Sequence, residues 1–176
     1  FSPGHKVGAR RALGLSASAP LLLFVGRIQP LKGLSVAVGA LAELVAGGHP
    51  DAELVVVGGP SGTDGIDEAR AVRALAASLG VAGRIRWVEP QPHHLLSSWY
   101  RAADVVLVPS RSESFGLVAL EAAACGTPVV AAAVGGLRTL VDHGRTGLLV
   151  ERRDASAFAR VAGRILSDPA LAASLS

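Results

Sequence analysis

The sequence predicts a doubly wound α/β domain with a parallel sheet, a Rossmann-like fold. Short runs rich in valine, leucine and isoleucine alternate with longer segments of helical periodicity, which is the pattern of repeated β/α units. The short runs are apolar at nearly every position, as expected for strands that helices cover on both faces. No internal repeat, low-complexity tract or second linker interrupts this alternation, so we expect one domain over residues 1–176.

The individual elements follow in chain order from the same pattern. Strands are predicted at residues 21–25, 53–57, 85–88, 105–108, 128–132 and 148–150. Helices are predicted at residues 34–46, 67–79, 94–102, 117–124 and 155–166. Asp154 is expected to cap the start of the last helix and Gly80 to end the second, because these residue types satisfy free backbone groups at helix ends.

Composition narrows the class of partner. The longest apolar stretches fall well short of the roughly 20 residues that a membrane span needs, so we expect no span. The net charge is +3, but the basic residues are scattered and few aromatic residues are available to stack on bases. This favours a small anionic ligand over nucleic acid. The lone cysteine, Cys125, permits no internal disulfide, and no signal segment opens the chain, so we expect a cytoplasmic protein.

The first residues have the composition of a linker. The chain opens with Phe1, Ser2, Pro3 and Gly4 and contains no methionine. We therefore expect it to be a piece of a longer protein. The sequence leaves the oligomeric state open.

The loop after the first predicted strand carries two cations five residues apart. It reads Gly-Arg-Ile-Gln-Pro-Leu-Lys-Gly from Gly26 to Gly33, with Arg27 and Lys32 between a strand end and a helix start. A planar guanidinium, a compact ammonium and free helix amides together suit a phosphate group. The loop matches neither a Walker motif nor a dinucleotide fingerprint. An exposed turn with two solvated charges is the alternative.

A second motif carries two glutamates separated by seven residues, Glu113 and Glu121. On one unbroken helix they would lie roughly 12 Å apart, at about 1.5 Å per residue, too far to share a proton. The spacing suits an extended ligand that is held at both ends. Glu121 lies in an apolar segment, where a carboxylate needs hydroxyl or amide donors, and sugar hydroxyls are such donors. Taken singly, each glutamate is more often a surface charge or a favourable charge near a helix N-terminus.

These motifs together resemble the C-terminal half of the family 4 glycosyltransferases of the GT-B fold. The similarity covers nearly the whole sequence and rests on the Gly-Arg-x4-Lys-Gly loop and the Glu-x7-Glu element with Phe-Gly inside it. The resemblance is supported by three further segments, residues 58–62, 100–104 and 113–136. Their sequences are most similar to the branch of the family that acts in mycothiol synthesis. The resemblance implies a retaining transferase that uses a nucleotide diphosphate sugar. It also implies an N-terminal domain, absent from this chain, that brings the acceptor and a catalytic histidine.

The resemblance assigns roles to the charged residues. Arg27 and Lys32 would bind the diphosphate and stabilise it as it leaves, and Glu113 would contact the donor sugar. These three are the expected catalytic residues. Gly26 belongs to the same donor-binding loop, and Glu121 would contact the ribose hydroxyls.

The remaining donor contacts are expected from the main chain. Groups near Gln91 would meet the base, with uracil the first choice, so the donor would be a UDP-sugar, with UDP-N-acetylglucosamine as one candidate. The amides at Phe115, Gly116 and Leu117 would face the sugar and phosphate. On its own, the chain is expected to bind UDP without completing a transfer.

The resemblance also implies a structural magnesium ion, held mostly by backbone oxygens at Tyr100, Arg101, Ala103 and Thr127. No side-chain pattern points to this ion independently. No cofactor is expected for the chemistry, since Arg27 and Lys32 would supply the positive charge. Arg138 stands where the family usually has proline, so the rim that faces the acceptor is expected to differ.

Two other classes of protein remain open. A non-hydrolysing nucleotide-sugar epimerase shares the fold, but an Asp-Ser-Gly-Gly segment would be expected near the phosphates and none is present. A nucleotide-binding module without chemistry is the second alternative. His93 and His94 are adjacent, so they are expected to point in different directions and not to form a metal site.

Overall fold

A computed structural model describes residues 1–175 and shows one six-stranded parallel sheet. The strands are β1 (Leu21–Val25), β2 (Glu53–Val57), β3 (Ile85–Val88), β4 (Val105–Val108), β5 (Val129–Ala132) and β6 (Leu148–Val150). Their order in the sheet is β3-β2-β1-β4-β5-β6, so the direction of winding reverses between β1 and β4. This order defines a doubly wound fold, which confirms the predicted class.

The helices are α1 (Lys6–Leu13), α2 (Leu34–Ala46), α3 (Gly62–Ser78), α4 (His93–Ala102), α5 (Leu117–Ala124), α6 (Leu137–Leu140), α7 (Ala155–Ser167) and α8 (Pro169–Ser174). Two short 3-10 helices, η1 (Pro30–Lys32) and η2 (Ala82–Arg84), lie in connections. The predicted caps are confirmed: the Asp154 side chain accepts a hydrogen bond from the Ala157 amide, and Gly80 follows α3 in the left-handed conformation.

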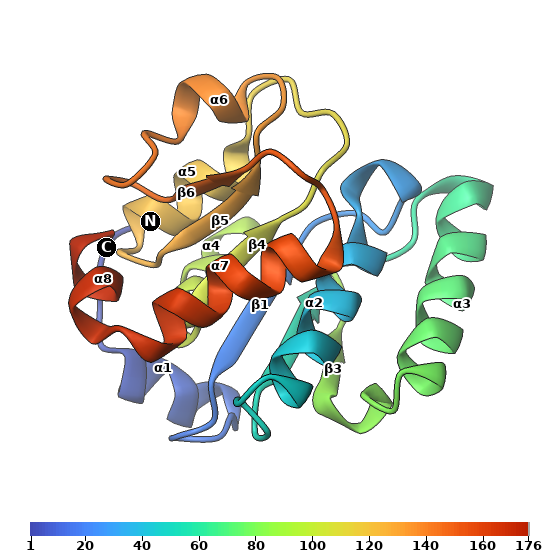
Figure 1. Ribbon diagram of the computed structural model, residues 1–176, viewed down its shortest axis with the longest axis horizontal. Coiled ribbons are helices and arrows are strands. Elements are labelled where there is room, and N and C mark those ends of the chain that lie inside the picture. The colour runs from blue at the N-terminus through green and yellow to red at the C-terminus, as the bar shows by residue number, and fades with distance from the viewer. Residues whose placement is uncertain (176) are drawn as a thin grey trace.

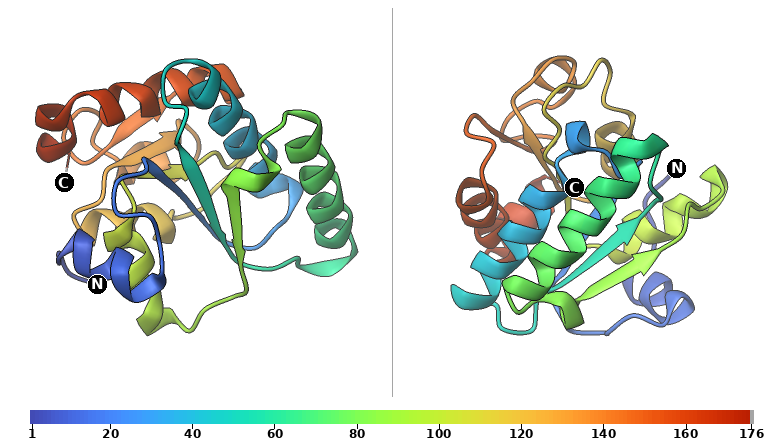
Figure 2. Two further views of the ribbon diagram at one scale, coloured as in Figure 1. Left: turned by 90° about the horizontal axis from the view of Figure 1, so that it is seen from below. Right: turned by 90° about the vertical axis from the view of Figure 1, so that its right-hand side faces the viewer.

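Helices cover both faces of the sheet. In Figure 1, α7 crosses in front of the sheet beside α2, while α4 and α5 lie behind it, and Figure 2 shows the same layers from below and from the side. Alternate strand residues enter the two layers: Leu22 packs with the α2 and α7 layer, and Leu23 with the α4 and α5 layer. Both neighbours are fully buried. The continuous apolar strands of the sequence follow from this burial on two sides.

The structure adds elements that the sequence pattern did not predict. Helices α1, α6 and α8 and both 3-10 helices were not expected, and α3 begins at Gly62, five residues earlier than predicted. Two glycines, at positions 62 and 65, concealed the start of α3 in the sequence. Gly65 is needed because a Cβ atom there would lie 2.5 Å from the Ile28 carbonyl oxygen, so the helix could not pack against that loop.

The first residues pack on α4. The Phe1 ring contacts His93 edge to face at a centroid distance of 4.7 Å, and the Arg101 Nε donates a 2.9 Å hydrogen bond to the Ser2 carbonyl. The linker-like segment is therefore held against the domain. Within residues 1–175, no helix is both long and apolar enough to cross a bilayer.

Gly58 allows the loops after β1 and β2 to touch. Its φ of 150° lies in the region that favours glycine, and a Cβ atom there would stand 1.9 Å from the Gly26 carbonyl oxygen. That oxygen belongs to the backbone and has no flexible side chain that could move away. The contact restrains the backbone of Gly26, the residue before Arg27.

Gly58→Ala is expected to destabilise the domain by about 3 kcal/mol, because the backbone must shift to relieve the overlap. Gly83→Ala is the matched control, since its added Cβ meets no atom within 4 Å and its backbone is not in the left-handed region. The measurement is chemical denaturation of both variants. Equal midpoints for Gly58→Ala and the parent chain would contradict the close approach.

Candidate functional site

The loops that follow β1 and β4 form the centre of the candidate site. In doubly wound sheets, ligands bind beyond the carboxyl ends of the strands where the strand order reverses, and here that point lies between β1 and β4. The Arg111 amide donates a 2.8 Å hydrogen bond to the Leu31 carbonyl and joins the two loops. A Cβ atom on Gly33 would lie 2.2 Å from the Pro109 carbonyl oxygen, so only glycine permits this approach.

Neighbouring loops are joined to this centre by further backbone bonds. The Ile28 amide donates to the Gly59 carbonyl at 2.9 Å, which connects the loop after β1 to the loop after β2. The Gly136 amide donates to the Glu113 carbonyl at 2.8 Å, which connects the loop after β4 to the loop after β5. The loops that the sequence separates by tens of residues therefore form one continuous rim.

Two helices begin at this rim with no side chain to cap or neutralise their N-termini. Helices α2 and α5 begin after Gly33 and Gly116, and neither helix has a side-chain cap or an acidic residue in its first turn. Free amides and the helix dipole make such ends favourable for anions. Phe115 and Leu117, on either side of Gly116 at the start of α5, are exposed residues, at 57% and 60%.

Lys32 and Glu113 form an ion pair in the cleft. The Lys32 Nζ lies 2.7 Å from the Glu113 Oε2, and the Ser110 hydroxyl donates to the same oxygen at 3.4 Å. Both charged side chains are largely covered, at 23% and 18% exposure. Since α5 begins only at Leu117, Glu113 lies in the loop as expected. Lys32 and Glu113 thus meet in one place although the sequence places them 81 residues apart.

Arg27 lines a hollow beyond the ends of β1 and β2. The hollow has a volume of about 390 Å³ and is lined by residues of the loops after β1, β2 and β3, among them Gly26, Arg27, Gly58 and Gln91, and by Leu96 of α4. Within residues 1–175 the Arg27 side chain makes no hydrogen bond or ion pair, so its guanidinium is available to a ligand. The Gln91 side chain turns back to the Glu89 carbonyl at 3.0 Å. The cleft therefore has room for a small molecule next to an unpaired cation.

Glu121 is partnered by protein side chains. The Tyr100 hydroxyl donates to Glu121 Oε2 at 2.6 Å, and His93 Nε2 lies 2.8 Å from Oε1. The Glu121 side chain is 11% exposed. Protein side chains therefore lie within hydrogen-bond distance of both carboxylate oxygens, and the expected contact of Glu121 with ribose hydroxyls stays a prediction.

The phenol of Tyr100 is a strong and permanent donor. Burial, followed by the hydrogen bond to Glu121, raises the pKa of Tyr100 far above its ordinary value. The phenol therefore keeps its proton throughout the physiological range. Tyr100 and His93 were not recognised from the sequence as partners of Glu121, although their spacing of seven residues puts both on one face of a helix.

Three of the four residues expected to hold magnesium meet at the Tyr100 carbonyl. The Tyr100 carbonyl accepts hydrogen bonds from the Thr127 hydroxyl at 2.7 Å and from the Ala103 amide at 3.1 Å. The Arg101 guanidinium binds Ser2. In this arrangement both lone pairs of the Tyr100 carbonyl oxygen are used, so this oxygen does not fit a cation as it stands. The magnesium site stays a prediction, and across residues 1–175 no cluster of three or more His, Cys, Asp or Glu side chains offers another.

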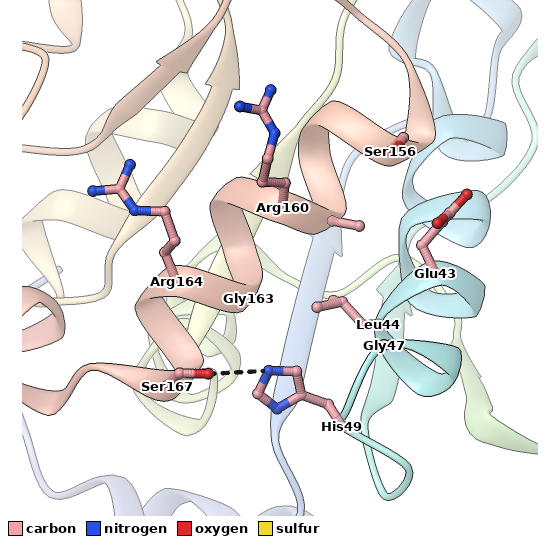
Figure 3. Close-up of a pocket in the computed structure, with 10 residues that line it drawn as sticks. Glu43, Leu44, Gly47, His49, Ser156, Arg160, Gly163, Arg164 and Ser167 are labelled. Carbon is pink, nitrogen blue, oxygen red and sulfur yellow. Dashed lines mark hydrogen bonds between the residues drawn. The ribbon is translucent and has the colours of Figure 1, made fainter.

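A second hollow, of about 420 Å³, lies between α2 and α7, in the helix layer that these two helices form on one face of the sheet. Figure 3 shows that Arg160 and Arg164 point away from His49, which is hydrogen-bonded to Ser167 at 3.3 Å. These cations do not converge on a common point. The hollow belongs to helix packing, where Gly163 lets α7 approach Leu44.

Tyr100 is the only tyrosine of the chain, so its ionisation can be followed directly. Its pKa in the folded chain is raised above the unfolded value of about 10. The unfolded chain therefore loses the phenolic proton first, and stability is full below pH 10 and falls as the pH rises above it. In an alkaline titration, phenolate absorbance is expected to appear only with loss of the circular dichroism signal. A phenolate signal near pH 10 in folded protein would show that Tyr100 is accessible.

Comparison with known proteins gives the family. Residues 8–176 match the model of the glycosyl transferases group 1. The D-inositol 3-phosphate glycosyltransferase of Acidothermus cellulolyticus is 53% identical over 99% of this chain, which spans only 39% of that relative's length. The chain thus corresponds to less than half of this curated relative.

Solved structures share the fold. Sucrose-phosphate synthase from Thermosynechococcus elongatus superposes with a TM-score of 0.90 at 42% identity, over 99% of this chain and 42% of that one. The C-terminal domain of a glycosyl transferase group 1 protein from Francisella tularensis gives 0.88 at 25% identity, over 99% and 89% of the two chains. HepE from Anabaena, described in complex with UDP and glucose, gives 0.88 at 27% identity, over 99% and 46%. The chain belongs to the glycosyl transferases group 1 and has the fold of the C-terminal domain of a GT-B enzyme.

Proposed function

We propose that this chain is the donor-binding domain of a retaining glycosyltransferase that uses a UDP-sugar. The observation that carries the proposal is the arrangement at the strand-order reversal: Lys32 pairs with Glu113 across the joined loops after β1 and β4, and helices α2 and α5, which follow these loops, begin without caps. A pyrophosphate would supply an anionic partner for Arg27 and for these helix N-termini. The UDP complex of HepE supports the choice of nucleotide.

Each group on the rim has a place along such a donor. Arg27 and Lys32 would bind the diphosphate, together with the amides at Phe115, Gly116 and Leu117. Glu113, beside Lys32, would contact the sugar, and Glu121 would accept hydrogen bonds from the ribose. Main-chain groups near Gln91, on the far side of the hollow, would meet the uracil. UDP-N-acetylglucosamine is one candidate donor.

The reaction breaks the bond between the anomeric carbon and the phosphate oxygen, and the electron pair stays on the phosphate. Negative charge therefore grows on the leaving diphosphate in the transition state. Cations that are already in position stabilise this charge without rearrangement, which lowers the barrier. Arg27 and Lys32 supply that charge in our proposal, so no metal ion is needed for the step.

The acceptor is expected to be bound by a further domain. The chain spans 39% of the D-inositol 3-phosphate glycosyltransferase that it matches, which leaves room in such a protein for another domain of similar size. In our proposal that N-terminal domain closes over the donor and brings the acceptor hydroxyl. The 176-residue chain would then bind UDP without turnover.

Calorimetry tests the proposal. The chain is expected to bind UDP at millimolar concentration or below, and Arg27→Ala or Lys32→Ala is expected to weaken UDP binding about tenfold while uridine binding changes by less than about twofold. The difference arises because only the diphosphate touches these cations. Arg160→Ala, an exposed cation on α7, is the matched control and should leave both affinities unchanged. Absence of UDP binding by the parent chain, or equal losses for UDP and uridine, would refute the assignment.

Glu113→Gln is expected to act in opposite directions on UDP and on a UDP-sugar. Removing the carboxylate frees Lys32 for the diphosphate, so UDP should bind roughly threefold more tightly. UDP-N-acetylglucosamine should lose the contact to its sugar, so its affinity relative to UDP should fall. Glu43→Gln, on α2 away from the rim, controls for the change of net charge. Parallel shifts for the two ligands would contradict a contact between Glu113 and the sugar.

A further inference from the structure

The side chain of Tyr100 has no part in the proposed donor contacts. It is completely buried, and its hydroxyl donates a hydrogen bond to Glu121. A buried phenol needs one hydrogen-bond partner, and in a core a backbone carbonyl commonly serves. Here the partner is a carboxylate, which is costly to bury unless donors meet it. The contact therefore ties a core residue to a residue of the proposed ribose site.

The two oxygens of Glu121 differ in their surroundings. Oε2 receives the Tyr100 hydroxyl from the buried side, whereas Oε1 lies 2.8 Å from Nε2 of His93, whose side chain is 71% exposed. Oε1 is therefore the oxygen whose protein partner is exposed, so a ligand hydroxyl that reaches Glu121 would meet it at Oε1, beside or in place of the His93 ring. The Tyr100 bond is what selects this orientation, since rotation of the carboxylate would break a 2.6 Å hydrogen bond to a charged acceptor.

The backbone of Tyr100 is held by a second hydrogen bond, on the side away from Glu121. The Thr127 hydroxyl, 2% exposed, donates to the Tyr100 carbonyl at 2.7 Å from the start of the connection to β5. Helix α4 is thereby fixed against the chain that follows α5, and the phenol cannot slide along Glu121. Thr127, Tyr100 and Glu121 form a continuous chain of hydrogen bonds from the core to the rim.

We propose that Tyr100 is a positioning residue for nucleoside recognition: it fixes the Glu121 carboxylate so that Oε1 faces the ribose hydroxyls of the donor. This inference rests on the proposed function and names a residue outside the donor contacts. It gives Tyr100 and Thr127 a purpose that requires no metal ion. A role in core packing alone would affect folding but would leave the choice among nucleosides unchanged.

The experiment measures the preference for a ribose with hydroxyl groups. Affinities of the chain for uridine and 2′,3′-dideoxyuridine are compared for the parent, Tyr100→Phe, Glu121→Ala and the double variant. The parent should prefer uridine, Glu121→Ala should lose that preference, and Tyr100→Phe should reduce it about fivefold. The double variant should behave as Glu121→Ala alone, because Tyr100 acts through Glu121. Trp99→Phe, a buried neighbour on α4, is expected to change thermal stability and leave the preference intact.

Several outcomes would overturn the inference. If Tyr100→Phe leaves the preference for uridine unchanged, the phenol only packs. The same conclusion follows if the double variant binds uridine more weakly than Glu121→Ala by the whole factor that Tyr100→Phe loses alone, because the two losses would then be independent. If Tyr100→Phe fails to fold, Thr127→Val provides the second variant: it keeps the phenol, and a smaller loss of the same preference is expected, whereas no loss counts against the inference. A parent chain that binds neither UDP nor uridine would refute the proposed function itself, and the inference with it.

Discussion

The close contact between the loops after β1 and β4 is the constraint on which the site depends. Gly33 lies so near the Pro109 carbonyl that no larger residue fits, and the Arg111 amide then reaches the Leu31 carbonyl. This contact brings Lys32 to Glu113 across 81 residues of sequence. Without it, the cations and the carboxylates would belong to separate surfaces.

The two carboxylates of the site are stabilised in different ways, and the difference suits different tasks. Glu113 lies in a loop and is paired with a charged amine, so its partner can be exchanged when an anion arrives. Glu121 lies in a helix between an uncharged phenol and an imidazole, and its position depends on the core. A loop carboxylate such as Glu113 can respond to a charged ligand, whereas a helix carboxylate such as Glu121 presents a fixed hydrogen-bond acceptor. In our proposal, Glu113 lies at the reacting end of the donor and Glu121 at its nucleoside end.

Much of the fold was readable from the sequence, and the exceptions have physical causes. The strands were predicted to within one residue because burial on both faces requires unbroken apolar runs. Helix α8 was missed although Asp168 and Pro169 form a recognisable start, since the six-residue helix is too short to show periodicity. In the candidate site, Arg27, Lys32, Glu113 and Glu121 were predicted from motifs, and their functional roles stay predictions. Their partners were not predicted, because the contacts of Tyr100 with Glu121 and of Lys32 with Glu113 arise only when loops and helices pack.

The charge balance at the carboxyl edge of the sheet explains why this surface is suited to an anion. Lys32 is neutralised by Glu113, but within residues 1–175 Arg27 has no acidic partner. Burial first, and then repulsion from the Arg111 guanidinium, lowers the pKa of Arg153. Such repulsion opposes folding and has no structural benefit of its own. In our proposal a bound diphosphate relieves this repulsion, so the same charges that destabilise the domain alone strengthen its binding of the donor.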